Sequence, residues 1–140
     1  MLSKITLQLV RNAHFPEGSS AIGYEFLAPL DDSGHINADA WRKERLSCTV
    51  KHFDPDAEDN HGFLVHRLGG SWAFHYEGEP LTEHEASGYR LSTHCFRPGE
   101  YISIQEENNE MLTYRVASVL PAALAKITQH AAWPREKWII

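Results

Sequence analysis

The sequence lacks any apolar run that approaches the ~18–20 residues of a membrane-spanning helix. It also lacks the charged start, long apolar segment and cleavage site of a secretory signal, because Met1–Lys4 leads straight into the alternating Ile5–Leu9. Cysteine is scarce: Cys48 and Cys95 form a lone pair, and without a secretory signal such a pair is more often two reduced thiols. These absences predict a cytoplasmic protein with no membrane partner and no disulfide.

Clustered positive charge is also missing. The 13 Lys and Arg residues are outnumbered by 19 Asp and Glu, and the formal net charge is −6. The densest basic stretch, Arg42–Arg45, is interrupted by Glu44. Binding to nucleic acid requires Lys and Arg gathered on one face, where they displace counterions. The sequence therefore predicts that nucleic acid is not a partner.

No motif in the sequence names a reaction. The chain has no G-x-S-x-G nucleophile turn and neither the H-x-x-x-H nor the C-x-x-C spacing of metal sites. No cofactor and no metal are therefore assigned. The working hypothesis is a non-enzymatic domain that binds a small-molecule ligand or another protein.

What the sequence has in quantity is short alternating segments separated by turn residues, which is typical of strands. Only two helices are predicted, a short one capped by Asn37 and a C-terminal one over Ala122–Ala132 that begins near Pro121. This pattern predicts a mainly β fold, either a small antiparallel β-barrel or a strongly curled sheet. The eight predicted strands are Ile5–Val10, Ile22–Leu27, Ser47–Phe53, Phe63–Leu68, Ser71–Glu77, Tyr89–Phe96, Glu100–Glu106 and Met111–Val119.

The chain contains no linker and no internal repeat, so residues 1–140 are predicted to form a single domain with the C-terminal helix and tail, 121–140, as an appendage. The end of that tail is apolar and includes Trp133, Trp138, Ile139 and Ile140. It is expected to pack on the domain or to join two copies of the chain into a homo-oligomer.

Gly69-Gly70 predicts a two-residue hairpin turn. With that turn, Leu64 faces His75 and His66 faces Ala73. One face of the hairpin then forms core, and the other carries His66 and His75 together. The predicted core face consists of Phe63, Val65, Trp72, Phe74 and Tyr76.

The histidines provide the candidate site. If His94 joins His66 and His75, three imidazoles surround one point, as in open zinc sites. This is the alternative function, a small enzyme or metal-binding protein. In the favoured interpretation, the same histidines line the mouth of a barrel together with Tyr114 and Arg115 and hold a small ligand.

Two further chemistries stay open. Cys95 could act as a nucleophile with His75; His94 cannot activate it directly, because adjacent strand residues point to opposite faces. A carboxylate inside the barrel, Glu25 or Glu100, could transfer protons.

Two resemblances complete the picture. Phe96–Ile104 (FRPGEYISI) resembles the PGQY segment that opens the flavin-binding barrel of ferredoxin-reductase-like enzymes, although this chain has Tyr114–Ser118 (YRVAS) in place of their R-x-Y-S element and has no nicotinamide domain. Most of residues 11–119 is similar to a bacterial family of conserved proteins without an assigned activity. The shared segments are FPEGSS and GYEFLAPLD, HGFLVHRLGGSWAFHYE, HCFRPGEYISI and TYRVASV. That second resemblance implies a bacterial cytoplasmic domain and no particular chemistry.

Overall fold

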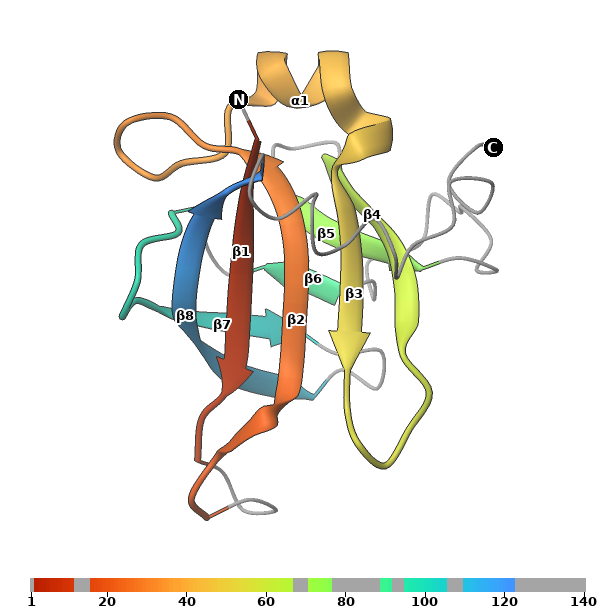
Figure 1. Cartoon of the computed structure of the whole chain (residues 1–140), viewed down its shortest axis with the longest axis vertical. Coiled ribbons are helices and arrows are strands. Elements are labelled where there is room, and N and C mark those ends of the chain that lie inside the picture. The colour runs from red at the N-terminus through yellow and green to blue at the C-terminus, as the bar shows by residue number, and fades with distance from the viewer. Residues whose placement is uncertain are drawn as a thin grey trace.

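The computed structural model describes residues 2–11, 16–66, 71–76, 89–91, 95–105 and 110–122. In this described part of the chain, eight antiparallel strands follow one another in sequence order around a closed barrel, and the last pairs with the first (Figure 1). The mainly β prediction is confirmed, and each predicted strand segment overlaps one of the observed strands. The strands are β1 (Leu2–Leu9), β2 (Ser19–Pro29), β3 (Thr49–Phe53), β4 (Asn60–His66), β5 (Trp72–Tyr76), β6 (Tyr89–Leu91), β7 (Tyr101–Gln105) and β8 (Met111–Pro121).

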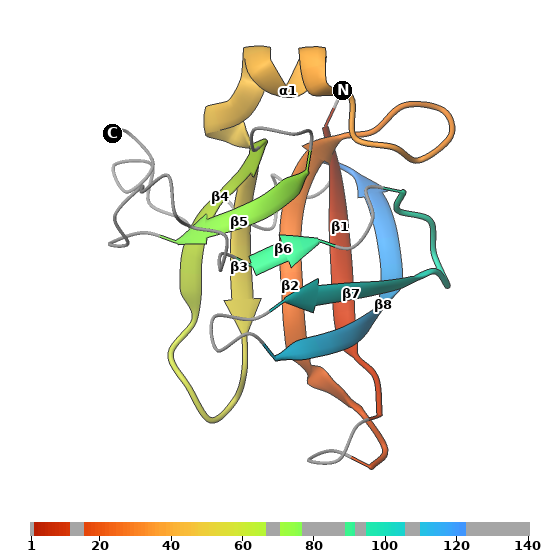
Figure 2. The same cartoon turned by 180° about the vertical axis from the view of Figure 1, so that it is seen from behind.

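The shortest of the strands described is β6, which spans 3 residues and lies between β5 and β7 (Figure 2). The predicted strand Tyr89–Phe96 is confirmed over Tyr89–Leu91 and is wrong at its end, whereas residues 92–94 lie outside the described residues. Cys95 forms an isolated bridge with His35, and the N–H of Phe96 donates to the carbonyl of Gly34 at 2.7 Å. These bonds bring the chain to the turn after β2, where the buried ring of Phe96 joins the core.

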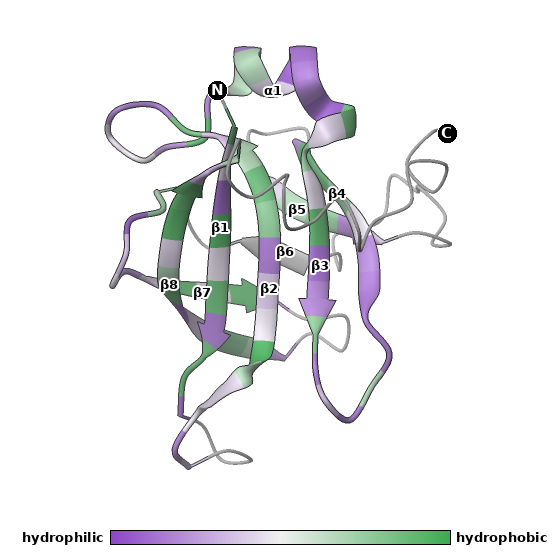
Figure 3. Ribbon diagram, in the orientation of Figure 1, coloured by the Kyte–Doolittle hydropathy of each residue, from purple (hydrophilic) through white to green (hydrophobic). Residues whose placement is uncertain are grey.

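Alternation along the long strands produces the inside and the outside of the barrel. Ile5, Leu7 and Leu9 of β1 are buried, whereas the residues between them are polar and partly exposed. Figure 3 shows the same change between apolar and polar positions along β1 and β2. Because successive strand residues point to opposite faces, one polar residue in two is enough to give β1 a solvated outer wall.

A short helix, α1 (Ala38–Glu44), continues into the 3₁₀ turn η1 (Arg45–Ser47) and lies over one end of the barrel (Figure 1). The predicted cap is confirmed, since the N–H of Ala40 donates to Oδ1 of Asn37 at 3.0 Å. Trp41 fixes the helix to the sheet: its ring is buried and its Nε1 donates to the carbonyl of Leu64 at 2.9 Å.

The last strand is longer than predicted. Pro121, expected in the first turn of a helix, is the last residue of β8 and pairs with Ser3. Ala122 is the last residue described, so the predicted helix Ala122–Ala132 and the apolar tail lie almost wholly outside the described residues. In the parts of the chain that are described, no helix is long and apolar enough to cross a membrane.

The pairing of β4 with β5 differs from the predicted register by one residue. Leu64 lies opposite Phe74, and His66 lies opposite Trp72. A shift of one residue moves every side chain of a strand to the other face. Phe63 and Val65, predicted to be core, therefore lie on the outer face and are only half-buried, while the prediction that Trp72, Phe74 and Tyr76 are buried is confirmed.

Gly62 explains why this register is the stable one. It faces Tyr76, and a Cβ at Gly62 would lie only 2.0 Å from the carbonyl oxygen of His75. Only glycine lets the two backbones approach so closely. The observed pairing places this glycine opposite Tyr76, where a Cβ would clash with the backbone of β5, and puts Leu64 inside the barrel.

Paired truncations test this register. Leu64 is 1% exposed, so Leu64→Ala is expected to lower the free energy of unfolding by about 2–5 kcal/mol through lost burial and a cavity. Val65→Ala on the half-buried outer face is expected to cost about 1 kcal/mol or less. Urea denaturation of both variants measures the difference. A larger cost for Val65→Ala would restore the predicted register.

Candidate functional site

Aromatic rings fill the inside of the barrel. Tyr24 of β2 is fully buried, and its ring centroid lies 4.8 Å from that of His52, 5.1 Å from that of Phe74 and 5.1 Å from that of Tyr114. Phe26, one inward position further along β2, lies 5.1 Å from Phe74 and 5.2 Å from Phe96. These rings come from β2, β3, β5 and β8 and from the segment before β7, so this part of the interior is packed core.

The histidine face expected from the sequence does not form. His66 points inward at the end of β4, where its ring stacks on Trp72 with centroids 4.1 Å apart and planes at 19°. His75 lies opposite Phe63 on the outer face of β5. The prediction that His66 and His75 share a face is therefore wrong, as a direct consequence of the one-residue shift in register. His94 lies outside the described residues.

Tyr114 and Arg115 are neighbours on β8 and consequently point in opposite directions. Tyr114 is fully buried and packs edge-on against Tyr24, so it belongs to the core and is not exposed at a barrel mouth. Arg115 is exposed on the outer wall and lines a groove there. Of the four candidate ligand residues that the structure describes, Arg115 is the one placed in this groove.

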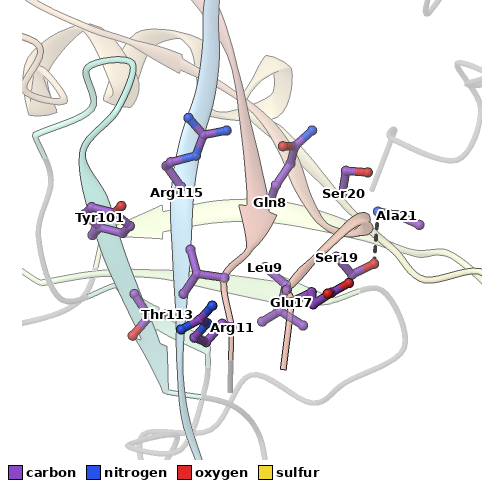
Figure 4. A pocket seen from close by; sticks show the side chains of 12 residues that line it. Gln8, Leu9, Arg11, Glu17, Ser19, Ser20, Ala21, Tyr101, Thr113 and Arg115 are labelled. Carbon is purple, nitrogen blue, oxygen red and sulfur yellow. Dashed lines mark hydrogen bonds between the residues drawn. The ribbon is translucent and has the colours of Figure 1, made fainter. Parts of the chain in front are cut away.

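The groove lies on the outside of the barrel, near the end of β1 and the start of β2 (Figure 4). Its volume is about 1010 Å³. Polar side chains dominate its lining, and they come from β1, β2, β7 and β8 and from the residues that precede β2. The lining residues are Gln8, Leu9, Val10, Arg11, Glu17, Gly18, Ser19, Ser20, Ala21, Tyr101, Thr113 and Arg115.

A row of directly opposed residues crosses the floor of this groove. Tyr101 of β7 pairs with Arg115 of β8, and Arg115 pairs with Gln8 of β1. Gln8 in turn pairs with Gly23 of β2, which lies outside the groove lining. Cross-strand neighbours of this kind have Cβ atoms about 4.5–5.5 Å apart, so Tyr101, Arg115 and Gln8 act on the same small area of surface.

Two positive charges in the groove have no partner in the described structure. Neither the side chain of Arg11 nor that of Arg115 makes an ion pair or a hydrogen bond with any described residue. One carboxylate, Glu17, lines the same groove, and no ion pair joins it to either arginine. By contrast, on the outer wall nearby, Nζ of Lys4 lies 3.4 Å from Oε1 of Glu25.

The position of Glu25, in an ion pair with Lys4, argues against the hypothesis that Glu25 transfers protons inside the barrel. Glu25 lies on the outer face, opposite Thr6 and Lys51, and not inside the barrel. Glu100, the other candidate, is exposed in the loop before β7. The structure therefore places neither carboxylate in the enclosed setting that the hypothesis requires.

A cluster of Asp31, Ser33, His35 and Cys95 combines the residue types of a nucleophilic site, but its hydrogen bonds build a turn. Oδ1 of Asp31 accepts from Oγ of Ser33 at 2.7 Å and from the N–H of His35 at 3.0 Å, and these bonds lower the pKa of Asp31. Sγ of Cys95 donates to the carbonyl of Ser33 at 3.6 Å. The carboxylate thus organises the turn after β2, as the Asp-Ser-Gly sequence predicts.

Cys48 and Cys95 are both free thiols. Cys48 is fully buried in the core, and this burial raises its pKa to about 12. A thiol that remains protonated is a poor nucleophile and a poor metal ligand. Across the described ranges, no three His, Cys, Asp or Glu side chains lie together in a way that could hold a metal ion.

Comparisons with known proteins give no match from which a function could be proposed. No protein-family model matches the chain, and neither the curated proteins nor the solved structures give a significant match. The two resemblances described above therefore rest on their quoted segments.

His52 gives this interior a testable pH dependence. Burial beside Tyr24 lowers the pKa of His52 below its usual 6.5, and the nearby charges of Asp54 and Asp59 oppose the shift only in part. The unfolded chain therefore binds a proton more readily than the folded one, so the stability of the fold declines as the pH falls below about 6.5.

We expect the His52 ring to titrate below 6.5 by NMR in the folded protein and near 6.5 in urea. His52→Gln should remove this part of the pH dependence; a folded midpoint at or above 6.5 would contradict the buried position.

Proposed function

We propose that this chain is a small-ligand-binding domain that uses the groove on its outer wall and not the inside of the barrel. The observation that supports this most strongly is the packing of Tyr24 against rings from three other strands, which leaves that part of the interior without room for a ligand. A ligand that cannot enter the core requires a site on the surface, and the groove is a hollow lined mainly by polar side chains.

The size and lining of the groove fit this role. Ligand pockets usually measure roughly 300–1,000 Å³, and the groove, at about 1010 Å³, lies at the upper end of that scale. Its polar groups, among them Arg115, Gln8 and Thr113, lie on paired strands. Strand pairing fixes the backbone at these positions before the ligand arrives, so only side-chain freedom has to be lost on binding.

The alternative function, a metal-binding protein or enzyme that uses His66, His75 and His94, loses its geometric basis. Two of its three imidazoles point to opposite sides of the sheet. The interaction of the domain with a protein remains the rival hypothesis, and exposed Tyr101 on the rim of the groove would suit it.

The remaining expectations about partners belong to the same proposal. We place the protein in the cytoplasm, with no cofactor and with neither nucleic acid nor membrane as a partner, in keeping with its net charge of −6. Homo-oligomer formation through residues 121–140 is a separate prediction, which sedimentation of the full chain and of a chain that ends at Ala122 would test.

A matched pair of substitutions tests the location of the site. Ala21 is exposed on the wall of the groove, and Ala57 is equally exposed in the acidic loop between β3 and β4, away from the groove. In an NMR screen of small soluble fragments, we expect saturable amide shifts around Gln8, Thr113 and Arg115. Ala21→Trp should abolish them by filling the groove, and Ala57→Trp should leave them unchanged.

Fragments that bind Ala21→Trp as well as the natural chain would overturn the proposed site. If no fragment binds but a protein partner protects Tyr101 and Arg115, the protein-interaction hypothesis would replace it.

A further inference from the structure

We infer that the groove recognises a small ligand with an oxyanion, a carboxylate or a phosphate, at one end and a flat ring at the other. This inference rests on the proposed function and adds the chemistry of the ligand. Arg11 and Arg115 are its main support, because both line the groove and neither side chain has a partner among the described residues.

Arg11 and Arg115 are distinguished by the groove that they share, because the lack of an ion pair is not itself unusual here. Nη1 of Arg42 lies 2.8 Å from Oδ1 of Asp39, whereas Arg45 on the exposed surface makes no ion pair with any described residue. Guanidinium groups bind carboxylate and phosphate through parallel N–H···O bonds, which are among the strongest hydrogen bonds in proteins.

The positions of the two arginines define where the anion would lie. The N–H of Val10 donates to the carbonyl of Thr113 at 3.1 Å, which places Val10 beside Thr113, two positions from Arg115 on β8. Arg11 is the next residue, so its backbone lies roughly 10 Å from that of Arg115 along the strand direction, and the two long side chains would have to extend toward each other to bind one oxyanion. Figure 4 shows Thr113 near Arg11, with Arg115 further along β8.

Neutral donors and a ring extend the site along the same row. Gln8 lies opposite Arg115 on one side, and Tyr101 lies opposite it on the other. The Tyr101 side chain is 63% exposed, an unusual state for a large ring, and it is available to stack on a flat ligand. The ring of the ligand would therefore lie toward β7, and its oxyanion toward Arg11 and Arg115.

Glu17 limits where an anion can bind. It lines the groove together with Ser19 and Ser20, on the part of the lining that leads into β2. Its negative charge repels an oxyanion from that side and leaves the β8 side as the favourable one. If this is correct, Glu17→Gln should strengthen the binding of an anion, a direction that a purely structural role for Glu17 would not produce.

Four probes separate the chemical alternatives: phenyl phosphate, benzoate, inorganic phosphate and the neutral benzyl alcohol. We expect phenyl phosphate and benzoate to give saturable NMR shifts at Gln8, Thr113 and Arg115 that weaken as NaCl is raised. Inorganic phosphate should bind the same residues more weakly, because it lacks the ring. The stronger of the two aromatic anions identifies the natural oxyanion as phosphate or carboxylate.

Charge-matched variants complete the test. Arg115→Gln and Arg11→Gln should each weaken phenyl phosphate about tenfold, the effect of losing one charged hydrogen bond. Lys43→Gln removes the same charge from exposed α1, at the opposite end of the barrel, and should change nothing (Figure 1). If all three variants weakened phenyl phosphate binding equally, the effect would come from the net charge of the protein, and the inference would be overturned.

The outcomes also distinguish this inference from the proposed function. Benzyl alcohol binding in the groove as tightly as phenyl phosphate, with no effect of either arginine variant, would refute the anion and leave the groove as the site. The absence of saturable binding by all four probes would refute the anion site. The fragment screen with Ala21→Trp would then decide on the groove itself.

Discussion

The closure of the barrel around Tyr24 is the constraint on which the rest of the structure depends. This one ring contacts His52 of β3, Phe74 of β5 and Tyr114 of β8, with centroids no more than 5.1 Å apart. Strands from opposite sides of the wall are thereby joined through side chains as well as through backbone pairing. Because aromatic rings fill this part of the core, the polar groups that could contact a ligand lie on the outer wall and at the ends of the barrel.

The strands and their approximate limits were predictable because alternation along a strand reports directly on burial. The Asn37 cap was predictable because its chemistry is local. The register of β4 on β5 was not predicted correctly. It was inferred from a turn at Gly69-Gly70, which lies outside the described residues. A better signal lay within the strand: Gly62 is a glycine in an alternating segment, which indicates a close approach of two backbones.

The candidate site was predicted only in part, and the reason is geometric. Arg115 is in the groove, but its neighbour Tyr114 is core, and a one-residue error in register was enough to place His66 and His75 on a common face that does not exist. The groove unites residues from opposite ends of the chain, such as Gln8 and Arg115, and their proximity depends on β8 returning to pair with β1. No local pattern in the sequence encodes that closure.

The central claim, a barrel filled by aromatic packing with its binding groove outside, is tested most directly by nuclear Overhauser contacts between ring protons. The account predicts contacts from the Tyr24 ring to both Phe74 and Tyr114, and from the Phe26 ring to Phe96. It also predicts that none of these rings exchanges magnetisation with water. Missing ring-to-ring contacts, with water signals in their place, would mean a hollow barrel and would move the ligand site to the interior.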